Sequence, residues 1–307
     1  DKHKAEVKKI LEDAGVGYVK IGVPTEERHI LATLHDATYQ FGIDYLRDVW
    51  YSTSYLLDRK QSMNGCAKKR FENYKQQPLE FVFDKSFTGK LSQFGLDPNR
   101  RTPSGIKAAI IREKGTNGER EMAYMLYLAG FDVKDVTMTD LISGRETLED
   151  INMVVYCGGF SNSDVLGSAK GWAGSFLFNP KAKAALDNFY AREDTLSLGV
   201  CNGCQLMMEL GLITPEDKKK GKMLHNDSHK FESNFLGVTV PMNRSVMFGS
   251  LSGSKLGIWV AHGEGKFSLP YPEDHYNVVL KYSYDEYPGN PNGSDYSVAG
   301  IASQDGR

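Results

Sequence analysis

The sequence predicts an α/β protein built on a doubly wound, mainly parallel sheet, with a small α+β segment in front of it. Three observations lead to this fold class. Strand-like and helix-like patterns alternate after Gly105, the strand-like runs end in glycine-rich turns, and two of these ends carry a cysteine. Such alternation is typical of parallel sheets, in which ligands bind at the carboxyl ends of the strands. We therefore expect a functional site where Cys157 and Cys201 end their strands.

Each element of the sheet follows from a local pattern. A continuous apolar run predicts a buried strand over 106–113, and apolar residues at helical spacing predict a helix over 118–130. A loop is predicted over 287–296, which is rich in Gly, Pro and Asn. Apolar runs bounded by turn residues predict the other strands, over 131–138, 151–159, 195–201, 237–241, 257–267 and 277–284.

The first part of the chain, residues 1–60, has the pattern of a small α+β segment. An N-terminal amphipathic helix ends at Gly15, two strand-like runs follow over 16–24 and 29–36, and a longer helix is predicted over 43–61. So few elements bury little apolar surface. We therefore expect this segment to have little core of its own.

Residues 61–103 are polar, rich in Lys and interrupted by Gly and Pro, which predicts a linker lying over a surface. Residues 104–307 hold the alternating strands and helices and form the second domain. Asp1 opens directly into a helical pattern, and Arg307 follows a strand and a turn. We therefore expect the chain to be a piece of a longer polypeptide that lacks the last segment of its second domain.

Composition limits the classes of function. The 307 residues include 37 basic and 39 acidic side chains, so no basic excess predicts binding to nucleic acid or to an anionic membrane. No apolar run approaches the roughly 20 residues of a membrane helix. Four cysteines in so long a chain do not make a disulfide framework. We expect a cytoplasmic protein without a metal site.

The segment around Cys201 has the pattern of a nucleophile elbow. Gly199, Cys201 and Gly203 form G-x-C-x-G, in which small flanking residues permit a strained turn from strand to helix. The partial positive charge of a helix N-terminus favours a thiolate there, so we expect a lowered pKa for Cys201. The alternative is a buried, inert cysteine that happens to precede a helix.

A second interpretation of the same segment involves Cys204. Cys201 and Cys204 form C-x-x-C, the spacing of a redox pair or of half a zinc site. A second ligand pair for zinc is missing, and the surrounding residues do not resemble a thioredoxin site.

Two further segments complete the candidate site. Gly158 and Gly159 at a strand end permit backbone N–H groups to point into a cleft, where, with the amide of Asn202, they could bind an oxyanion. The alternative is an ordinary tight turn. His262 lies in a glycine-bounded turn and is a candidate base, although a loop histidine is also a common polar surface residue.

These three segments, in this order, resemble class I glutamine amidotransferase domains. Several longer strings of residues resemble still more closely the C-terminal glutaminase domain of the family of large, single-chain phosphoribosylformylglycinamidine synthases of purine biosynthesis. The strings that carry this resemblance are GGFSNSDVLGSAKGWAGSFLFN, LGVCNGCQLM, HNDSHKFESNF, AHGEGKF and YPGNPNGS. The resemblance covers about residues 104–307. YLRDVWYSTSYLLDRKQ resembles the closing helix of the family's synthetase region, so residues 1–60 would be a C-terminal remnant of that region.

The resemblance implies a glutamine-hydrolysing carbon–nitrogen ligase that depends on ATP and magnesium. Its glutaminase would hydrolyse L-glutamine through a cysteinyl thioester and pass ammonia to the upstream synthetase region of the same polypeptide. There the ammonia would replace the formyl oxygen of formylglycinamide ribonucleotide. The sites for ATP and magnesium would lie upstream, with no cofactor held by residues 1–307.

The resemblance also implies roles for particular residues. Cys201 would be the nucleophile. The amides of Gly159, Phe160 and Asn202 would form the oxyanion hole. The segments that line the glutamine pocket contain Gln205, His262 and Gly263.

One departure from the family pattern affects activity. The family's general base is the histidine of a His-Pro-Glu motif just beyond a strand that corresponds to residues 300–307, and none of the seven histidines here precedes Pro-Glu. We therefore expect the chain by itself to be inactive. Two other classes of function stay open: a non-catalytic binding or scaffolding domain, and a thiol-redox protein that uses Cys201 and Cys204.

Overall fold

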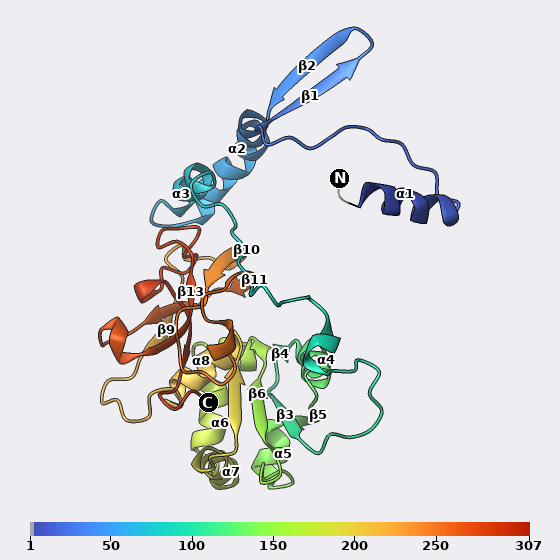
Figure 1. Cartoon of the computed structure of the whole chain (residues 1–307). Helices are drawn as coiled ribbons and strands as arrows, with labels where there is room; N and C mark the ends of the chain where they lie inside the picture. Colours follow the sequence, from blue (N-terminus) through green and yellow to red (C-terminus); the bar gives the residue numbers. More distant parts are fainter. Residues whose placement is uncertain (1–2) are drawn as a thin grey trace. The chain divides into compact units, whose positions relative to one another are not determined.

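The computed structural model describes residues 3–307 and divides into two compact units (Figure 1). The first ends at Ser54 and the second runs from Tyr55 to Arg307. The expected domain limits at 60 and 103 remain predictions. In the structure, residues 61–73 belong to the second unit, and most of them are helical. Among the described residues, no helix is both long and apolar enough to cross a membrane.

The first unit contains a helix and a hairpin. Helix α1 covers Lys4–Asp13, and strands β1 (His29–Leu34) and β2 (Ala37–Gly42) pair antiparallel around a two-residue turn. Helix α2 (Ile43–Gln61) begins in this unit and ends in the second. The predicted strand over 16–24 is wrong. Its backbone pairs with no strand among the described residues, and an unpaired apolar run does not make a sheet.

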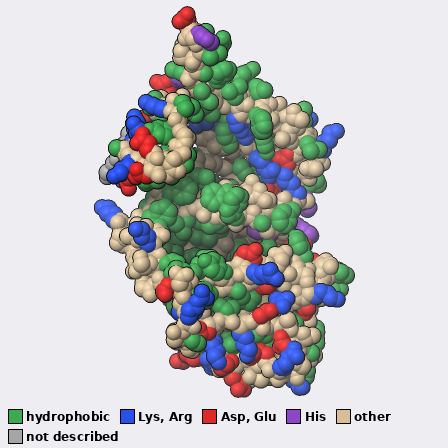
Figure 2. Space-filling model, turned by 90° about the vertical axis from the view of Figure 1, so that its right-hand side faces the viewer, with side chains coloured by type: hydrophobic (Ala, Val, Ile, Leu, Met, Phe, Trp, Pro, Cys, Tyr) green, Lys and Arg blue, Asp and Glu red, His purple; other side chains and the backbone are tan. Residues whose placement is uncertain are grey.

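No side chain of residues 3–54 is buried, as expected for a segment with little core of its own. The apolar side chains of Val19 and Ile21, for example, are 83% and 98% exposed. Figure 2 shows many hydrophobic side chains at the surface of the molecule on the face it draws. Exposed apolar surface of this kind is what a protein normally buries against another part of a chain or a partner.

The second unit is built on a four-stranded parallel sheet with the order β5-β3-β6-β8. Both faces of the sheet are covered, because Ile110 and Val155 pack in one apolar cluster whereas Ile111 and Val154 pack in the other. The fold class predicted from the sequence is therefore confirmed. The strands are β3 (Lys107–Arg112), β5 (Asp132–Thr137), β6 (Met153–Tyr156) and β8 (Leu196–Gly199).

Helices connect these strands and supply the rest of the two clusters. Leu126 of α4 packs on one face, whereas Trp172 of α6, Phe189 of α7 and Leu206 of α8 pack on the other. The helices are α4 (Glu119–Leu128), α5 (Met138–Ser143), α6 (Lys170–Leu177), α7 (Pro180–Ala191) and α8 (Asn202–Glu209). Figure 1 shows α5, α6 and α7 together with the parallel strands.

The later strands form a separate antiparallel sheet, with the order β11-β10-β13-β14. Short pairs, β4 (Thr116–Asn117) with β7 (Gly158–Gly159) and β9 (Lys222–Leu224) with β12 (Lys266–Ser268), lie outside both larger sheets. Helix α3 covers Cys66–Asn73. The antiparallel strands are β10 (Glu232–Thr239), β11 (Lys255–His262), β13 (Asn277–Tyr282) and β14 (Val298–Ala302).

Limited proteolysis should cut the second unit first between Asp84 and Lys90. These residues are all exposed and form no helix or strand, and proteases prefer such segments. By contrast, Cys66 and Ala67 at the start of α3 are buried, which protects the first part of the predicted linker. Trypsin digestion with timed mass spectrometry checks this, and a first cut within 255–265 would contradict the predicted boundary.

Candidate active site

Cys201 lies on the strand-to-helix turn that G-x-C-x-G predicts. Strand β8 ends at Gly199, α8 begins at Asn202, and Cys201 between them has φ +53° and ψ −110°. A positive φ is uncommon for a residue with a side chain and is concentrated at functional turns. A Cβ on Gly203 would collide with the carbonyl oxygen of Tyr156, so only glycine fits there. This close approach lets α8 start directly behind the thiol.

The sulfur atom of Cys201 is surrounded by backbone groups. It lies 3.4 Å from the carbonyl oxygen of Ala261, and the backbone N–H groups of Gly159 and Asn202 act to lower the pKa of its thiol. Burial raises the pKa of the Cys201 thiol and outweighs the lowering by these two amides. The expected lowering of this pKa is therefore wrong, because the helix terminus acts on a thiol that is largely removed from water.

Gly159 brings its amide to the sulfur through the short β4–β7 pair. Thr116 pairs with Gly159, whose φ is +120°, and a Cβ on Gly159 would lie 2.6 Å from the Cα of Thr116. Glycine is therefore required at this position. The neighbouring Phe160 N–H donates to the carbonyl oxygen of Gly115 at 2.9 Å, so in this structure it is already engaged.

Helix α8 also contacts the turn after β7 and the turn after β11, which lie on either side of the thiol. The buried Asn202 side chain accepts from the N–H of Ser161 at 3.0 Å and donates to Gln205 Oε1 at 2.8 Å. Gln205 Nε2 in turn donates to the carbonyl oxygen of Glu264 at 2.8 Å. The turn after β7 and the turn after β11 are thereby tied to one helix.

His262 is held in a neutral form beside the thiol. Burial lowers its pKa to about 4, and its Nδ1 lies 3.3 Å from Nδ2 of Asn292. Because an amide nitrogen only donates, Nδ1 is the acceptor of this hydrogen bond. Among residues 3–307, no histidine is hydrogen-bonded to the sulfur of Cys201. His262 therefore lines the site without a hydrogen bond to the thiol.

A cavity of about 710 Å³ opens in front of Cys201. Of the seven residues that the sequence singled out, six line it, and Asn202 reaches the site through its backbone amide. Those six are Gly159, Phe160, Cys201, Gln205, His262 and Gly263.

Sequence reasoning missed most of the charged lining of this cavity. Glu121, Asp164, Lys230 and Glu264 all face it, as do His225 and His229. Burial raises the pKa of Asp164, and the nearby Glu264 charge acts in the same direction. Several of these residues lie inside the strings that carry the family resemblance, and no local pattern assigned them a role.

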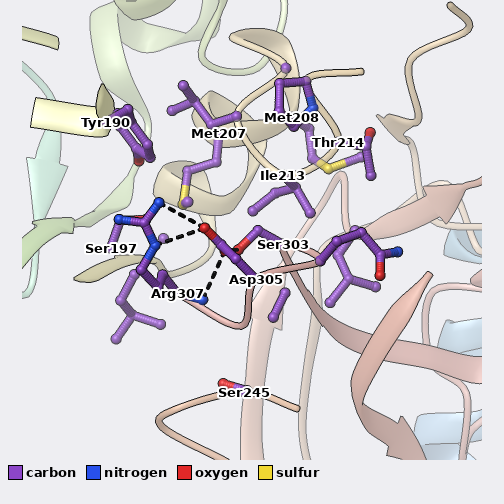
Figure 3. A pocket seen from close by; sticks show the side chains of 18 of the residues that line it. Tyr190, Ser197, Met207, Met208, Ile213, Thr214, Ser245, Ser303, Asp305 and Arg307 are labelled. Carbon is purple, nitrogen blue, oxygen red and sulfur yellow. Dashed lines mark hydrogen bonds and ion pairs between the residues drawn. The ribbon is translucent and has the colours of Figure 1, made fainter. Parts of the chain in front are cut away.

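A second cavity, of about 670 Å³, lies beside Cys204, Met207 and Met208 of α8 (Figure 3). Met207, Met208 and Ile213 line it, and Arg307 forms an ion pair with Asp305 beside them. Cys204 lines this second cavity, whereas Cys201 lines the first. Burial raises the pKa of Cys204 to about 12. The two thiols of C-x-x-C thus face different spaces.

These features define an α/β protein with a cysteine on a nucleophile elbow. Residues 105–307 match the model of the CobB/CobQ-like glutamine amidotransferase domain. The chain therefore belongs to the CobB/CobQ-like glutamine amidotransferase family.

Curated relatives extend the similarity across nearly the whole chain. The chain is 36% identical to phosphoribosylformylglycinamidine synthase of Drosophila melanogaster over 98% of its length. It is 40% identical, over 86% of its length, to the probable chloroplastic/mitochondrial phosphoribosylformylglycinamidine synthase of Arabidopsis thaliana. The matches cover 23% and 20% of these two relatives, so the chain spans about a fifth to a quarter of their length.

A solved structure also has a similar fold. It is the structure of PurLQS from Thermotoga maritima, with a TM-score of 0.53 and 28% sequence identity. The match covers 66% of this chain and 83% of that one. This solved structure therefore shares its fold with about two thirds of the chain.

Proposed function

We propose that the chain is the glutaminase portion of a phosphoribosylformylglycinamidine synthase, with Cys201 as its nucleophile. The observation that carries this proposal is the thiol on its strained turn beside the cavity, with the backbone N–H groups of Gly159 and Asn202 close enough to lower its pKa. Amides placed beside a nucleophile are positioned to receive the oxyanion that its attack creates. The family match and the names of the relatives support the same function.

The reaction then follows from these groups. The thiolate of Cys201 attacks the side-chain amide carbon of L-glutamine, and the resulting oxyanion accepts hydrogen bonds from Gly159 and Asn202. The carbon–nitrogen bond breaks, ammonia leaves with an added proton, and a glutamyl thioester remains on Cys201. Water cleaves the thioester to give glutamate and the free thiol. Phe160 would join as a third donor if its bond to Gly115 opened.

The glutamine side chain would lie in the cavity beside Gln205, His262 and Gly263. We propose that the base which moves protons between thiol, ammonia and water lies outside residues 3–307. Two observations support this: no histidine in the described part of the chain is bonded to the thiol, and His262 is neutral and engaged with Asn292. The resembled family places this base in a His-Pro-Glu motif.

The whole reaction would need the region upstream of this chain. There, ammonia would replace the formyl oxygen of formylglycinamide ribonucleotide in an ATP- and magnesium-dependent step of cytoplasmic purine biosynthesis. Among residues 3–307, no group of three or more His, Cys, Asp or Glu side chains is arranged so that it could hold a metal ion. The upstream synthetase region is also the partner that would cover the exposed apolar side chains of the first unit.

The two other classes of function receive no support from the relatives, which are named as synthases. A thiol-redox function further requires that Cys201 and Cys204 approach one another, and they line different cavities.

A glutamine-analogue electrophile should alkylate Cys201 first, and free glutamine should protect it. Cys66 and Cys157 are buried, and Cys204 faces the other cavity, so none of them meets a ligand bound in the glutamine pocket. Peptide mapping by mass spectrometry checks the site of labelling. Labelling mainly at Cys66 or Cys204, or labelling that glutamine does not slow, would contradict the assignment of Cys201 as the nucleophile.

The labelling should also depend on pH in a defined direction. Because burial raises the pKa of Cys201, its thiolate fraction should still be rising at pH 8.5, the ordinary value for cysteine. The rate with a neutral reagent such as iodoacetamide should therefore increase through pH 8.5 without a plateau below it.

A further inference from the structure

One wall of the glutamine cavity is a loop with no helix or strand of its own. We call residues 225–231 the pocket loop; His225, His229, Lys230 and Phe231 of this loop line the cavity. His229 has φ +53°, a conformation that costs free energy for a residue with a side chain. A loop in such a conformation keeps its shape only when its surroundings hold it.

The end of α2 and the start of α3 provide direct contacts to this loop. We call residues 58–70 the α2–α3 corner. The Met63 N–H donates to the carbonyl oxygen of Ser228 at 2.9 Å, and Asn64 Nδ2 donates to that of Asp227 at 2.7 Å. Lys230 Nζ forms an ion pair with Asp58. Three successive parts of the corner thus contact three successive parts of the pocket loop.

Behind these contacts lies a buried ionic network. The side chain of Arg70 donates to Asp58 at 3.2 Å and to Glu232 at 2.6 Å, and both carboxylates are almost fully buried. Burial alone would raise the pKa of Asp58, but hydrogen bonds from Lys230 and Ser62 and the charge of Arg70 outweigh it and lower the pKa. Asp58 is therefore ionised and fixed in place. Because separating a buried charge from its partner is costly, this network holds the corner next to Glu232.

The opposite side of the pocket loop is joined to the turn after β11. The buried Asn226 donates to the carbonyl oxygens of Lys230 at 3.0 Å and His262 at 2.7 Å, and its Oδ1 accepts from the Gly265 N–H at 3.0 Å. A displacement of the loop would therefore reach His262 and Gly263, which line the cavity next to Cys201. The corner, the pocket loop and the glutamine cavity form one continuous set of contacts.

We propose that the α2–α3 corner positions the pocket loop for glutamine binding, with Asp58 and Asn64 as positioning residues. Neither side chain lines the cavity; each acts through the loop residue it contacts. This inference rests on the proposed glutaminase function, because it assigns the cavity to glutamine. Removing either contact should weaken the binding of a glutamine-shaped ligand without altering the reactivity of the thiol itself.

The test compares saturable labelling of Cys201 by a glutamine-analogue electrophile in the full chain and in its variants. Asp58→Asn should raise the half-saturating concentration at least about tenfold, because an ionised partner of Lys230 is lost. Asn64→Gly should raise it about threefold, since glycine accepts the φ of +54° at this exposed position and only the hydrogen bond to Asp227 is removed. Lys60→Ala, an exposed change on the same helix, is the matched control and should leave it unchanged.

Two further readouts separate positioning from mere support of the fold. The limiting labelling rate and the rate with iodoacetamide should stay within about twofold in every folded variant, because the elbow around Cys201 is untouched. If Asp58→Asn does not fold, Asn64→Gly decides the question, because its lost hydrogen bond lies at the surface. If both variants have the same half-saturating concentration as Lys60→Ala, the inference is wrong, whereas the proposed function is unaffected. Failure of the unaltered chain to show saturable labelling would overturn the proposed function and this inference with it.

Discussion

Replacing Cys201 with alanine is expected to lower glutamate release from glutamine at least about 10⁴-fold in a chain long enough to carry the His-Pro-Glu motif. The reason is that the thioester route needs a nucleophile, and the amides of Gly159 and Asn202 alone cannot supply one. Cys204→Ala is the matched control. Its thiol lies three residues further along, faces the second cavity and has a pKa of about 12, so its removal should leave the rate nearly unchanged.

The outcome also separates the two thiol chemistries. A redox pair would lose function when either cysteine is replaced, whereas a nucleophile elbow loses function only with Cys201. Equal losses in the two variants would therefore contradict the proposed mechanism. Coupled-enzyme detection of glutamate is sufficient to measure both rates.

The second large effect concerns the proton carrier. Residues 1–307 alone should release glutamate at least about a hundredfold more slowly than a longer chain that includes the His-Pro-Glu motif, since general acid–base catalysis is typically worth 10² to 10⁴ in rate. In the shorter chain the thiol, the two amides and the cavity are all present. The difference between the two rates of glutamate release would therefore measure the contribution of the base.

His262 gives this comparison its control. His262→Asn in the longer chain should affect the half-saturating glutamine concentration more than the limiting rate, because His262 is neutral and lines the cavity. Equal rates from the short and long chains would contradict the proposal and would make a residue within 3–307 the base, with His262 the first candidate.

The elbow and the sheet could be predicted because their signals are local. A glycine two residues before and two residues after Cys201 is enough to predict the turn, and continuous apolar runs are enough to predict β3 and β6. The predicted helix over 43–61 coincides with α2. In each case the residues that determine the element are close together in the sequence.

The features that could not be predicted depend on contacts between distant segments. Asp58 and Lys230 are far apart in the sequence, and nothing in their local patterns distinguishes them from other charged surface residues. Only the fold brings them together in an ion pair. The pKa of Cys201 depends in the same way on how deeply the finished fold buries the thiol, so the local helix-terminus rule gave the wrong direction. Asn226 and Asn292 join three loops around His262, and no periodic pattern distinguishes them from surface amides.

The covalent intermediate is the most direct test of the central claim that this chain cleaves glutamine through Cys201. A longer chain that includes the His-Pro-Glu motif is incubated with glutamine, quenched in acid and digested, and the peptide that contains Cys201 is examined by mass spectrometry. We expect a fraction of this peptide to carry the mass of one glutamyl group, the adduct to be lost on treatment with hydroxylamine as a thioester is, and the Cys201→Ala chain to show none. A glutamyl group on another residue, or glutamate release by the long chain with no adduct at Cys201 under any quench condition, would contradict the account.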